Sequence, residues 1–223
     1  MKTYSIAIDG PAASGKSTAA KGVAKALDFL YLDTGAMYRA ITLYMIEKGL
    51  DTRSEEDAKS ILDEVTMRED KNGHIFLNER DVTERVREED VTKLVSYACA
   101  HKAVRERLVA LQREMAKGES VIMDGRDIGT VVLPDATLKV YQVASVESRA
   151  KRRYLEELSK GKEASLDEIQ KDIERRDYID SHREHSPLRK AEDAILLDTS
   201  DLTIQEEIDA ILSLFREKAG ELK

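Results

Sequence analysis

The sequence predicts an α/β fold in which a parallel five-stranded sheet is flanked by helices. Two observations carry this prediction: five short apolar runs alternate with longer stretches of helical periodicity, and four of the five runs end on an aspartate. Short apolar runs are typical of strands that are buried on both faces of a parallel sheet. Ligands bind beyond the carboxyl ends of such strands, so the aspartates mark the edge where a functional site is expected.

The strands and helices follow from the runs in chain order. The expected strands are residues 5–9, 29–33, 121–124, 138–143 and 194–198. Apolar stripes predict two amphipathic helices, one with Ala20, Val23, Ala24 and Leu27 and one with Ile204, Ile208, Ile211, Leu212 and Phe215. Thr203 and Glu206 have the spacing of a capping box, which predicts where the second helix begins.

Residues 63–100 interrupt the alternation of strands and helices. Within them, residues 65–68 and 74–77 resemble strands and flank the sequence Asp-Lys-Asn-Gly. Asn-Gly between two such runs is a strong β-hairpin signal. We therefore expect a small antiparallel insertion, which is either a structural ornament or, as we favour, a subdomain that faces a substrate.

Composition limits the function classes. The chain has 223 residues, which predicts a single domain, and 36 basic against 44 acidic residues give a net charge of −8. An acidic surface disfavours general binding to nucleic acid or to anionic membranes. No apolar run has the length of a signal peptide core or a membrane span. The single cysteine, Cys99, allows no internal disulfide and favours a reducing, cytoplasmic location.

The segment after the first expected strand carries the clearest motif. Residues 10–17, GPAASGKS, fit the P-loop pattern G-x-x-x-x-G-K-[ST] and stand between a strand and a helix, as that motif requires. Backbone N–H groups of the loop and the helix N-terminus converge on a phosphate, and the lysine reaches the β- and γ-phosphates. The residues expected to bind ATP are Gly10, Pro11, Ala12, Ala13, Ser14, Gly15, Lys16, Ser17 and Thr18.

A P-loop also predicts a Mg²⁺ ion that accompanies the nucleotide. Its expected ligands are the hydroxyl of Ser17 and, at the end of a later strand, the carboxylate of Asp124. Asp33 is a rival for the second position, because it also ends a strand. Either aspartate could instead cap a neighbouring helix.

Two arginines predict a second anion site near the P-loop. Arg39 follows the second expected strand and Arg126 follows the third, so both lie at the carboxyl edge of the sheet. Guanidinium groups bind phosphate oxygens in bidentate fashion. A second phosphate is therefore expected, although either arginine alone could lie on a solvated helix face.

Residues 148–183 contain a cationic pair of helices. Arg149, Lys151, Arg152, Arg153, Arg175, Arg176 and Arg183 lie on two expected helices that are joined near residues 158–162, and Ser165 with Glu168 caps the second. Such a pair suits a lid that neutralises a transferring phosphoryl group and excludes water. The alternative is an ordinary charged helix pair, laced with glutamates.

Several segments together resemble the bacterial cytidylate kinases, a family of nucleoside-monophosphate kinases. The resemblance rests on residues 8–11 leading into the P-loop, LDTGAMYR at 32–39, DGRDIGTVV at 124–132, and the Arg176-Asp177 and Asp180-Ser181-x-Arg183 segments before Ser186-Pro187-Leu188. It implies transfer of the ATP γ-phosphoryl group to CMP or dCMP, a Mg²⁺ requirement, a monomer, a mobile lid and an insertion near the acceptor nucleoside.

The resemblance also implies roles for particular residues. Acceptor contacts are expected from Thr34, Tyr38, Arg39, Ser96, Arg105, Arg126, Asp127, Arg176, Asp180 and Arg183. Lys16, Arg126 and the lid residue Arg152 are the expected catalytic cations, although the sequence does not say which lid arginine touches the transferred group. Cytosine has an N4 amine, from which Asp127 could accept a hydrogen bond. Its N3 and O2 atoms are acceptors, to which Arg105 and Ser96 could donate.

Two other functions remain open at this point. One is a P-loop kinase that acts on another small acceptor, such as UMP or a non-nucleotide metabolite. The other is an ATP-dependent switch that hydrolyses ATP slowly and binds a macromolecule. The second arginine set argues against the switch, since a switch needs no acceptor phosphate.

Overall fold

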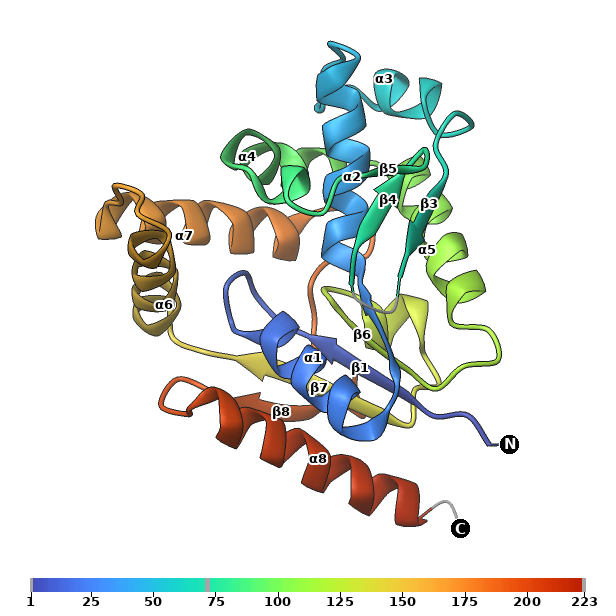
Figure 1. The fold of residues 1–223 in the computed structure, drawn as a ribbon, viewed down its shortest axis with the longest axis vertical. Coiled ribbons are helices and arrows are strands. Elements are labelled where there is room, and N and C mark those ends of the chain that lie inside the picture. The colour runs from blue at the N-terminus through green and yellow to red at the C-terminus, as the bar shows by residue number, and fades with distance from the viewer. Residues whose placement is uncertain (1, 71–72, 222–223) are drawn as a thin grey trace.

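A five-stranded parallel sheet forms the centre of the molecule, as the sequence predicts. The computed structural model describes residues 2–70 and 73–221. The strand order is β2-β6-β1-β7-β8, and all four strand pairs are parallel (Figure 1). The strands are β1 (Ser5–Asp9), β2 (Leu30–Asp33), β6 (Val121–Gly125), β7 (Leu138–Val143) and β8 (Ile195–Asp198). Each expected strand is confirmed to within one residue at either end.

Both faces of the sheet are covered, which explains why its strands are apolar runs. Successive side chains of a strand point to opposite faces. In β1, Ile6 and Ile8 pack on one face with residues of α1 (Lys16–Leu27) and α8 (Ile204–Glu221). Ala7 packs on the other face with residues of α5 (Lys102–Met115) and the π-helical turn η2 (Ile128–Val132).

The capping box at the start of α8 is confirmed. The Thr203 amide donates to Glu206 Oε2 at 2.8 Å, and the Glu206 amide donates to Thr203 Oγ1 at 3.3 Å. Both helix stripes pack as expected through most of their length. The exception is Ile204, whose side chain stays 56% exposed because the helix makes only its first turn there.

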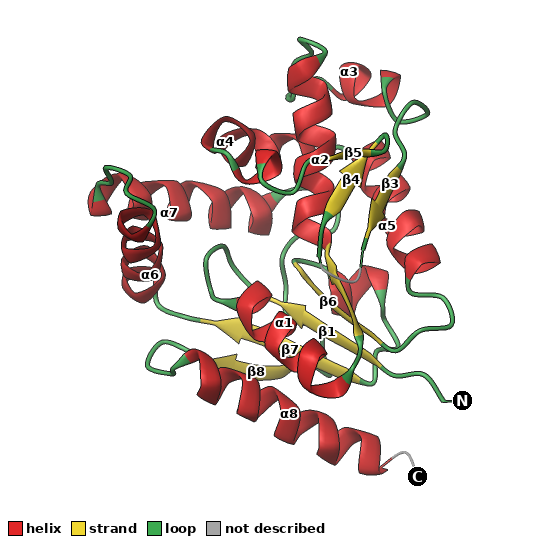
Figure 2. Cartoon of the chain, in the orientation of Figure 1, coloured by secondary structure: helices red, strands yellow, loops and turns green. Residues whose placement is uncertain are grey.

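A second core lies beside the sheet and contains the insertion. Its helices are α2 (Thr34–Glu47), α3 (Glu55–Ser60), α4 (Glu89–Ala98) and α5, with a 3-10 turn η1 (Arg85–Arg87). The antiparallel sheet has the order β3-β4-β5, with β3 (Met67–Glu69), β4 (Ile75–Leu77) and β5 (Arg80–Asp81) (Figure 2). The hairpin pairing is confirmed, whereas Lys71 and Asn72 of the expected turn lie outside the described residues. The sequence did not predict β5.

The cationic helices α6 (Val146–Ser159) and α7 (Leu166–His182) pack against each other at one side of the molecule, beyond the loop that follows β1 (Figure 1). The Ser165 hydroxyl accepts the Glu168 amide at 3.4 Å, so the expected cap of α7 forms. Among residues 2–70 and 73–221, no helix combines the length and the apolar character needed to cross a membrane.

Candidate active site

The P-loop connects β1 to α1 at the carboxyl edge of the sheet. Gly10 is needed because the backbone passes so close to β7 that a Cβ would lie 2.0 Å from the Gln142 carbonyl oxygen. Gly15 has a φ of 90°, a left-handed conformation that favours glycine, and it precedes the first residue of α1. The loop therefore presents its amides at a helix N-terminus, which is a ready anion site.

Lys16 lies inside the curve of this loop. Its side chain amine donates to the Pro11 carbonyl at 2.7 Å and to Ser14 Oγ at 3.2 Å, and the residue is only 5% exposed. Burial, helped by the positive charge of Arg126, lowers the pKa of Lys16 from 10.5 to about 7. A phosphate that reaches this amine would favour its charged form.

Ser17 and Asp124 lie side by side, and together they fit a Mg²⁺ ion. Ser17 Oγ donates to Asp124 Oδ2 at 2.8 Å, and the Tyr31 hydroxyl donates to Oδ1 at 2.7 Å. These are the hard oxygen ligands that Mg²⁺ prefers. Within the two described ranges, no group of three or more His, Cys, Asp or Glu side chains could hold a metal alone. A Mg²⁺ ion here would therefore depend on nucleotide oxygens and water as well.

Asp33, the rival metal ligand, is occupied with other partners. Its Oδ1 accepts the Ala36 amide at 2.8 Å and so caps α2. Burial alone would raise the pKa of Asp33, but the guanidinium groups of Arg39 and Arg87 outweigh it and hold the pKa below its ordinary value. These partners favour Asp124 over Asp33 for the metal.

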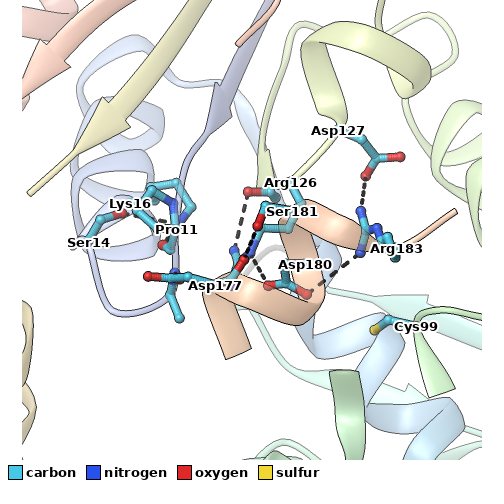
Figure 3. A network of polar contacts seen from close by, with 12 residues as sticks. Pro11, Ser14, Lys16, Cys99, Arg126, Asp127, Asp177, Asp180, Ser181 and Arg183 are labelled. Atoms are coloured by element: carbon cyan, nitrogen blue, oxygen red, sulfur yellow. Dashed lines mark hydrogen bonds and ion pairs between the residues drawn. The ribbon is translucent and has the colours of Figure 1, made fainter. Parts of the chain in front are cut away.

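A network of arginines and carboxylates lies next to the P-loop, and Figure 3 shows it between Lys16 and Asp127. Arg126 Nε donates to Asp180 Oδ2 at 2.8 Å. Arg183 lies 3.8 Å from both Asp180 and Asp127. Burial would raise the pKa of Asp180, but Arg126 and Arg183 hold it below its ordinary value.

Arg105 and Asp127 form a deeply buried ion pair of this network, and both side chains are 4% exposed. Arg105 also donates to the Cys99 carbonyl at 3.1 Å. The Cys99 thiol is itself buried, and burial raises its pKa to about 11. It is therefore protonated at neutral pH.

Four of the expected acceptor residues carry a buried polar atom with no hydrogen-bond partner. In the described part of the chain these atoms are Tyr38 Oη, Arg39 Nε, Arg105 Nε and Arg176 Nε. Leaving a buried donor unpaired is costly, so such groups are usually satisfied by protein, water or a ligand. Their concentration at one site indicates a place that a polar ligand completes.

Two further expected acceptor residues lie near this network. The Thr34 hydroxyl donates to the backbone carbonyl of Asp124 at 2.6 Å, so it joins α2 to β6. Ser96 is buried on α4, the helix that packs against α2. The structure thus places Thr34 on α2 and Ser96 on the helix packed against it, with the Thr34 hydroxyl already bonded within the protein.

Two lid arginines lie beside the P-loop and have different partners. Arg149 donates to the Ala12 carbonyl at 2.9 Å and to Asp177 at 2.6 Å, while the Ala12 amide donates to Asp177 at 3.0 Å. Arg152 pairs with Glu207 of α8 at 3.2 Å and donates to the Thr199 carbonyl, and its Nη1 lies beside the P-loop, 3.4 Å from where a Cβ on Gly15 would be. Sequence reasoning named Arg152 as catalytic and assigned no role to Asp177.

Asp9 joins the strand β1, which precedes the P-loop, to the turn η2. Its two carboxylate oxygens accept the amides of Ile128 and Gly129 at 2.8 and 2.7 Å. Burial raises the pKa of Asp9 from 3.8 to about 6, despite these two bonds. Sequence reasoning missed this role, because its only signal was one strand-end aspartate among four.

Comparison with known proteins shows the family of this chain. The family model described as "Cytidylate kinase" matches residues 6–217. The chain belongs to the cytidylate kinase family. The cytidylate kinase of Streptococcus pneumoniae (strain 70585) is 51% identical to it over 95% of the chain and 96% of the relative. That of Halalkalibacterium halodurans is 49% identical over 98% of the chain and 100% of the relative.

The similarity of this chain to solved structures concerns the fold alone. A gluconokinase from Sinorhizobium meliloti has a TM-score of 0.52 at 15% identity and covers 98% of this chain and 95% of its own. A shikimate kinase from Bacteroides thetaiotaomicron has a TM-score of 0.50 at 13% identity and covers 96% of this chain and 98% of its own. This chain shares its overall architecture with these two kinases.

Proposed function

We propose that this chain transfers the γ-phosphoryl group of ATP to CMP or dCMP and releases ADP with CDP or dCDP. The observation that carries the proposal is the cluster of unpaired buried donors on Tyr38, Arg39, Arg105 and Arg176, next to a P-loop. Membership of the cytidylate kinase family supports it, since the curated relatives carry that name over nearly the full chain.

On the donor side, the P-loop amides and Lys16 hold the ATP phosphates. Positioning and electrostatics do most of the work in phosphoryl transfer. The acceptor phosphate is already an anion, so no side chain needs to remove a proton from it. Ser17 and Asp124 are the residues that would hold a Mg²⁺ ion, which would supply positive charge to offset that of the phosphates.

On the acceptor side, the base and the phosphate are read by different residues. Asp127 accepts from the cytosine amine, and Arg105 and Ser96 donate to its acceptor atoms. Arg126, together with Arg176, binds the acceptor phosphate. Uracil presents a carbonyl where cytosine has its amine, so the same pocket would leave buried polar groups unpaired and would reject UMP strongly.

The helices α6 and α7 form the proposed lid. Arg149 and Asp177 tie the lid to the P-loop at Ala12, which places positive charge beside the donor phosphates. Closing these helices over the site would keep water from the transferring group. We propose that the enzyme acts as a cytoplasmic monomer, in keeping with its single buried thiol.

A coupled assay with CMP, dCMP, UMP and AMP tests the function. We expect transfer to CMP and dCMP to exceed transfer to UMP and AMP by a large factor. The variant Asp127→Asn should lose most of the preference for cytosine, whereas Asp193→Asn, which alters the ion pair of an exposed carboxylate with Lys139, should keep it. Equal rates on UMP, or ATP hydrolysis without acceptor as fast as transfer, would contradict the proposal.

A further inference from the structure

The carboxylate of Asp124 has a different partner on each oxygen. Oδ2 faces Ser17 Oγ at 2.8 Å, on the side of the P-loop. Oδ1 accepts a hydrogen bond from the Tyr31 hydroxyl at 2.7 Å. The two oxygens are therefore not equivalent, since only Oδ2 lies beside the other proposed metal ligand.

Tyr31 is held in place by its own strand and by α1. It belongs to β2, two residues before Asp33, and pairs in register with Ile122 of β6. Its ring packs against the core on the α1 face of the sheet, and the Lys21 amine lies 5.5 Å from the ring centre. The ring is thus held, and its hydroxyl reaches Asp124, one residue before β6 ends.

A fixed hydroxyl on Oδ1 matters because an aspartate carboxylate turns easily about its last torsion. The backbone of Asp124 is already anchored, since the Thr34 hydroxyl donates to its carbonyl at 2.6 Å. With the backbone and Oδ1 both held, Oδ2 has one orientation, toward Ser17. Outer partners of this kind orient metal ligands, and losing one typically costs 10- to 100-fold in metal affinity or activity.

We propose that Tyr31 is a positioning residue for the Mg²⁺ site, acting through Asp124. This inference rests on the proposed function, which places Mg²⁺ at Ser17 and Asp124. Tyr31 touches neither nucleotide in this assignment. Its hydroxyl orders the carboxylate before the metal and ATP arrive, so its loss should weaken metal binding without affecting the acceptor.

The test is Tyr31→Phe, which removes only the hydroxyl. Mn²⁺ binding to the enzyme with a non-hydrolysable ATP analogue is measured by electron paramagnetic resonance, beside the KM for CMP and the thermal unfolding of the metal-free protein. We expect Mn²⁺ affinity to fall about 10- to 100-fold, with the KM for CMP and the unfolding temperature near wild type. The matched control is Tyr44→Phe, because the Tyr44 hydroxyl donates to Glu64 at 2.8 Å on the surface.

A double-mutant cycle with Asp124→Asn shows whether Tyr31 acts through Asp124. In the Asp124→Asn background, Tyr31→Phe should change Mn²⁺ affinity less than twofold. Unchanged Mn²⁺ affinity in Tyr31→Phe, an equal loss in both backgrounds, or a parallel loss of CMP affinity and thermal stability would each overturn the inference. A wild-type enzyme that binds Mn²⁺ with the analogue but does not phosphorylate CMP would contradict the proposed function and leave the Tyr31 result readable.

Discussion

The stability of the protein should fall as the pH rises from 4 to 6, because of Asp9. This carboxyl is buried at the end of β1, where it accepts the amides of Ile128 and Gly129. Burial outweighs these bonds and raises its pKa to about 6, whereas an unfolded chain would have the ordinary value of 3.8. Between these two values the folded protein binds more protons than the unfolded chain.

The size of the effect follows from proton linkage. The free energy of unfolding changes by about 1.4 kcal/mol per pH unit for each proton that one state binds and the other does not. Across roughly two pH units this gives a loss of about 3 kcal/mol. The contribution is fully present below pH 3.8 and is lost as the pH rises through 6.

Urea unfolding of the wild type and of Asp9→Asn at several pH values from 4 to 7 measures this loss. Asparagine does not titrate, so the wild-type stability should fall across this range by about 3 kcal/mol more than that of the variant. Asp198→Asn is the matched control, since Asp198 also ends a strand but is exposed and has a lowered pKa. Parallel curves for wild type and Asp9→Asn would refute the reasoning.

Three further substitutions have defined outcomes. Lys16→Ala should lower turnover by orders of magnitude with an unchanged circular dichroism spectrum, and near-normal turnover would reject its role. Gly22→Ala should lower the free energy of unfolding by about 1–3 kcal/mol, although alanine favours helix more than glycine, because the new Cβ would lie 2.2 Å from Ile208 Cδ1. Adding Ile208→Ala should remove that penalty. Thr203→Ala should cost about 1 kcal/mol through the lost cap of α8, and an unchanged denaturation midpoint would show that the cap contributes nothing.

The sheet could be predicted from sequence because its signal is local. A strand buried on both faces is an uninterrupted apolar run, and the runs at 5–9 and 138–143 match β1 and β7 residue for residue. The strand β5 could not be predicted in this way. It has two residues, Arg80 and Asp81, both exposed, and it forms only because β4 offers a free edge.

The P-loop could also be predicted, because its signal is a local motif, but the roles of the strand-end aspartates could not. Three of the four roles depend on residues that are distant in the sequence. Asp9 is bonded to amides of η2, Asp33 to Arg87 of η1, and Asp124 to Tyr31 of β2. Asp198 is exposed and bonds only locally, to Ser200. Four chemically identical signals therefore have four different outcomes.

The partners of the arginines near the P-loop could not be predicted from the sequence either, and these partners affect how a phosphate would bind. Composition predicts the cationic helices, but the direction in which each arginine side chain points depends on its position around the helix. Arg149 faces the P-loop, whereas Arg153, four residues later, pairs with Glu157 of the same helix. Arg149, and Arg126 from the segment after β6, are already paired with carboxylates of α7, Asp177 and Asp180 respectively. A phosphate must therefore compete with α7 for the same guanidinium groups. Nucleotide binding and movement of α7 are for this reason expected to be coupled, since any phosphate that draws Arg126 away from Asp180 weakens the contact that holds the helix in place.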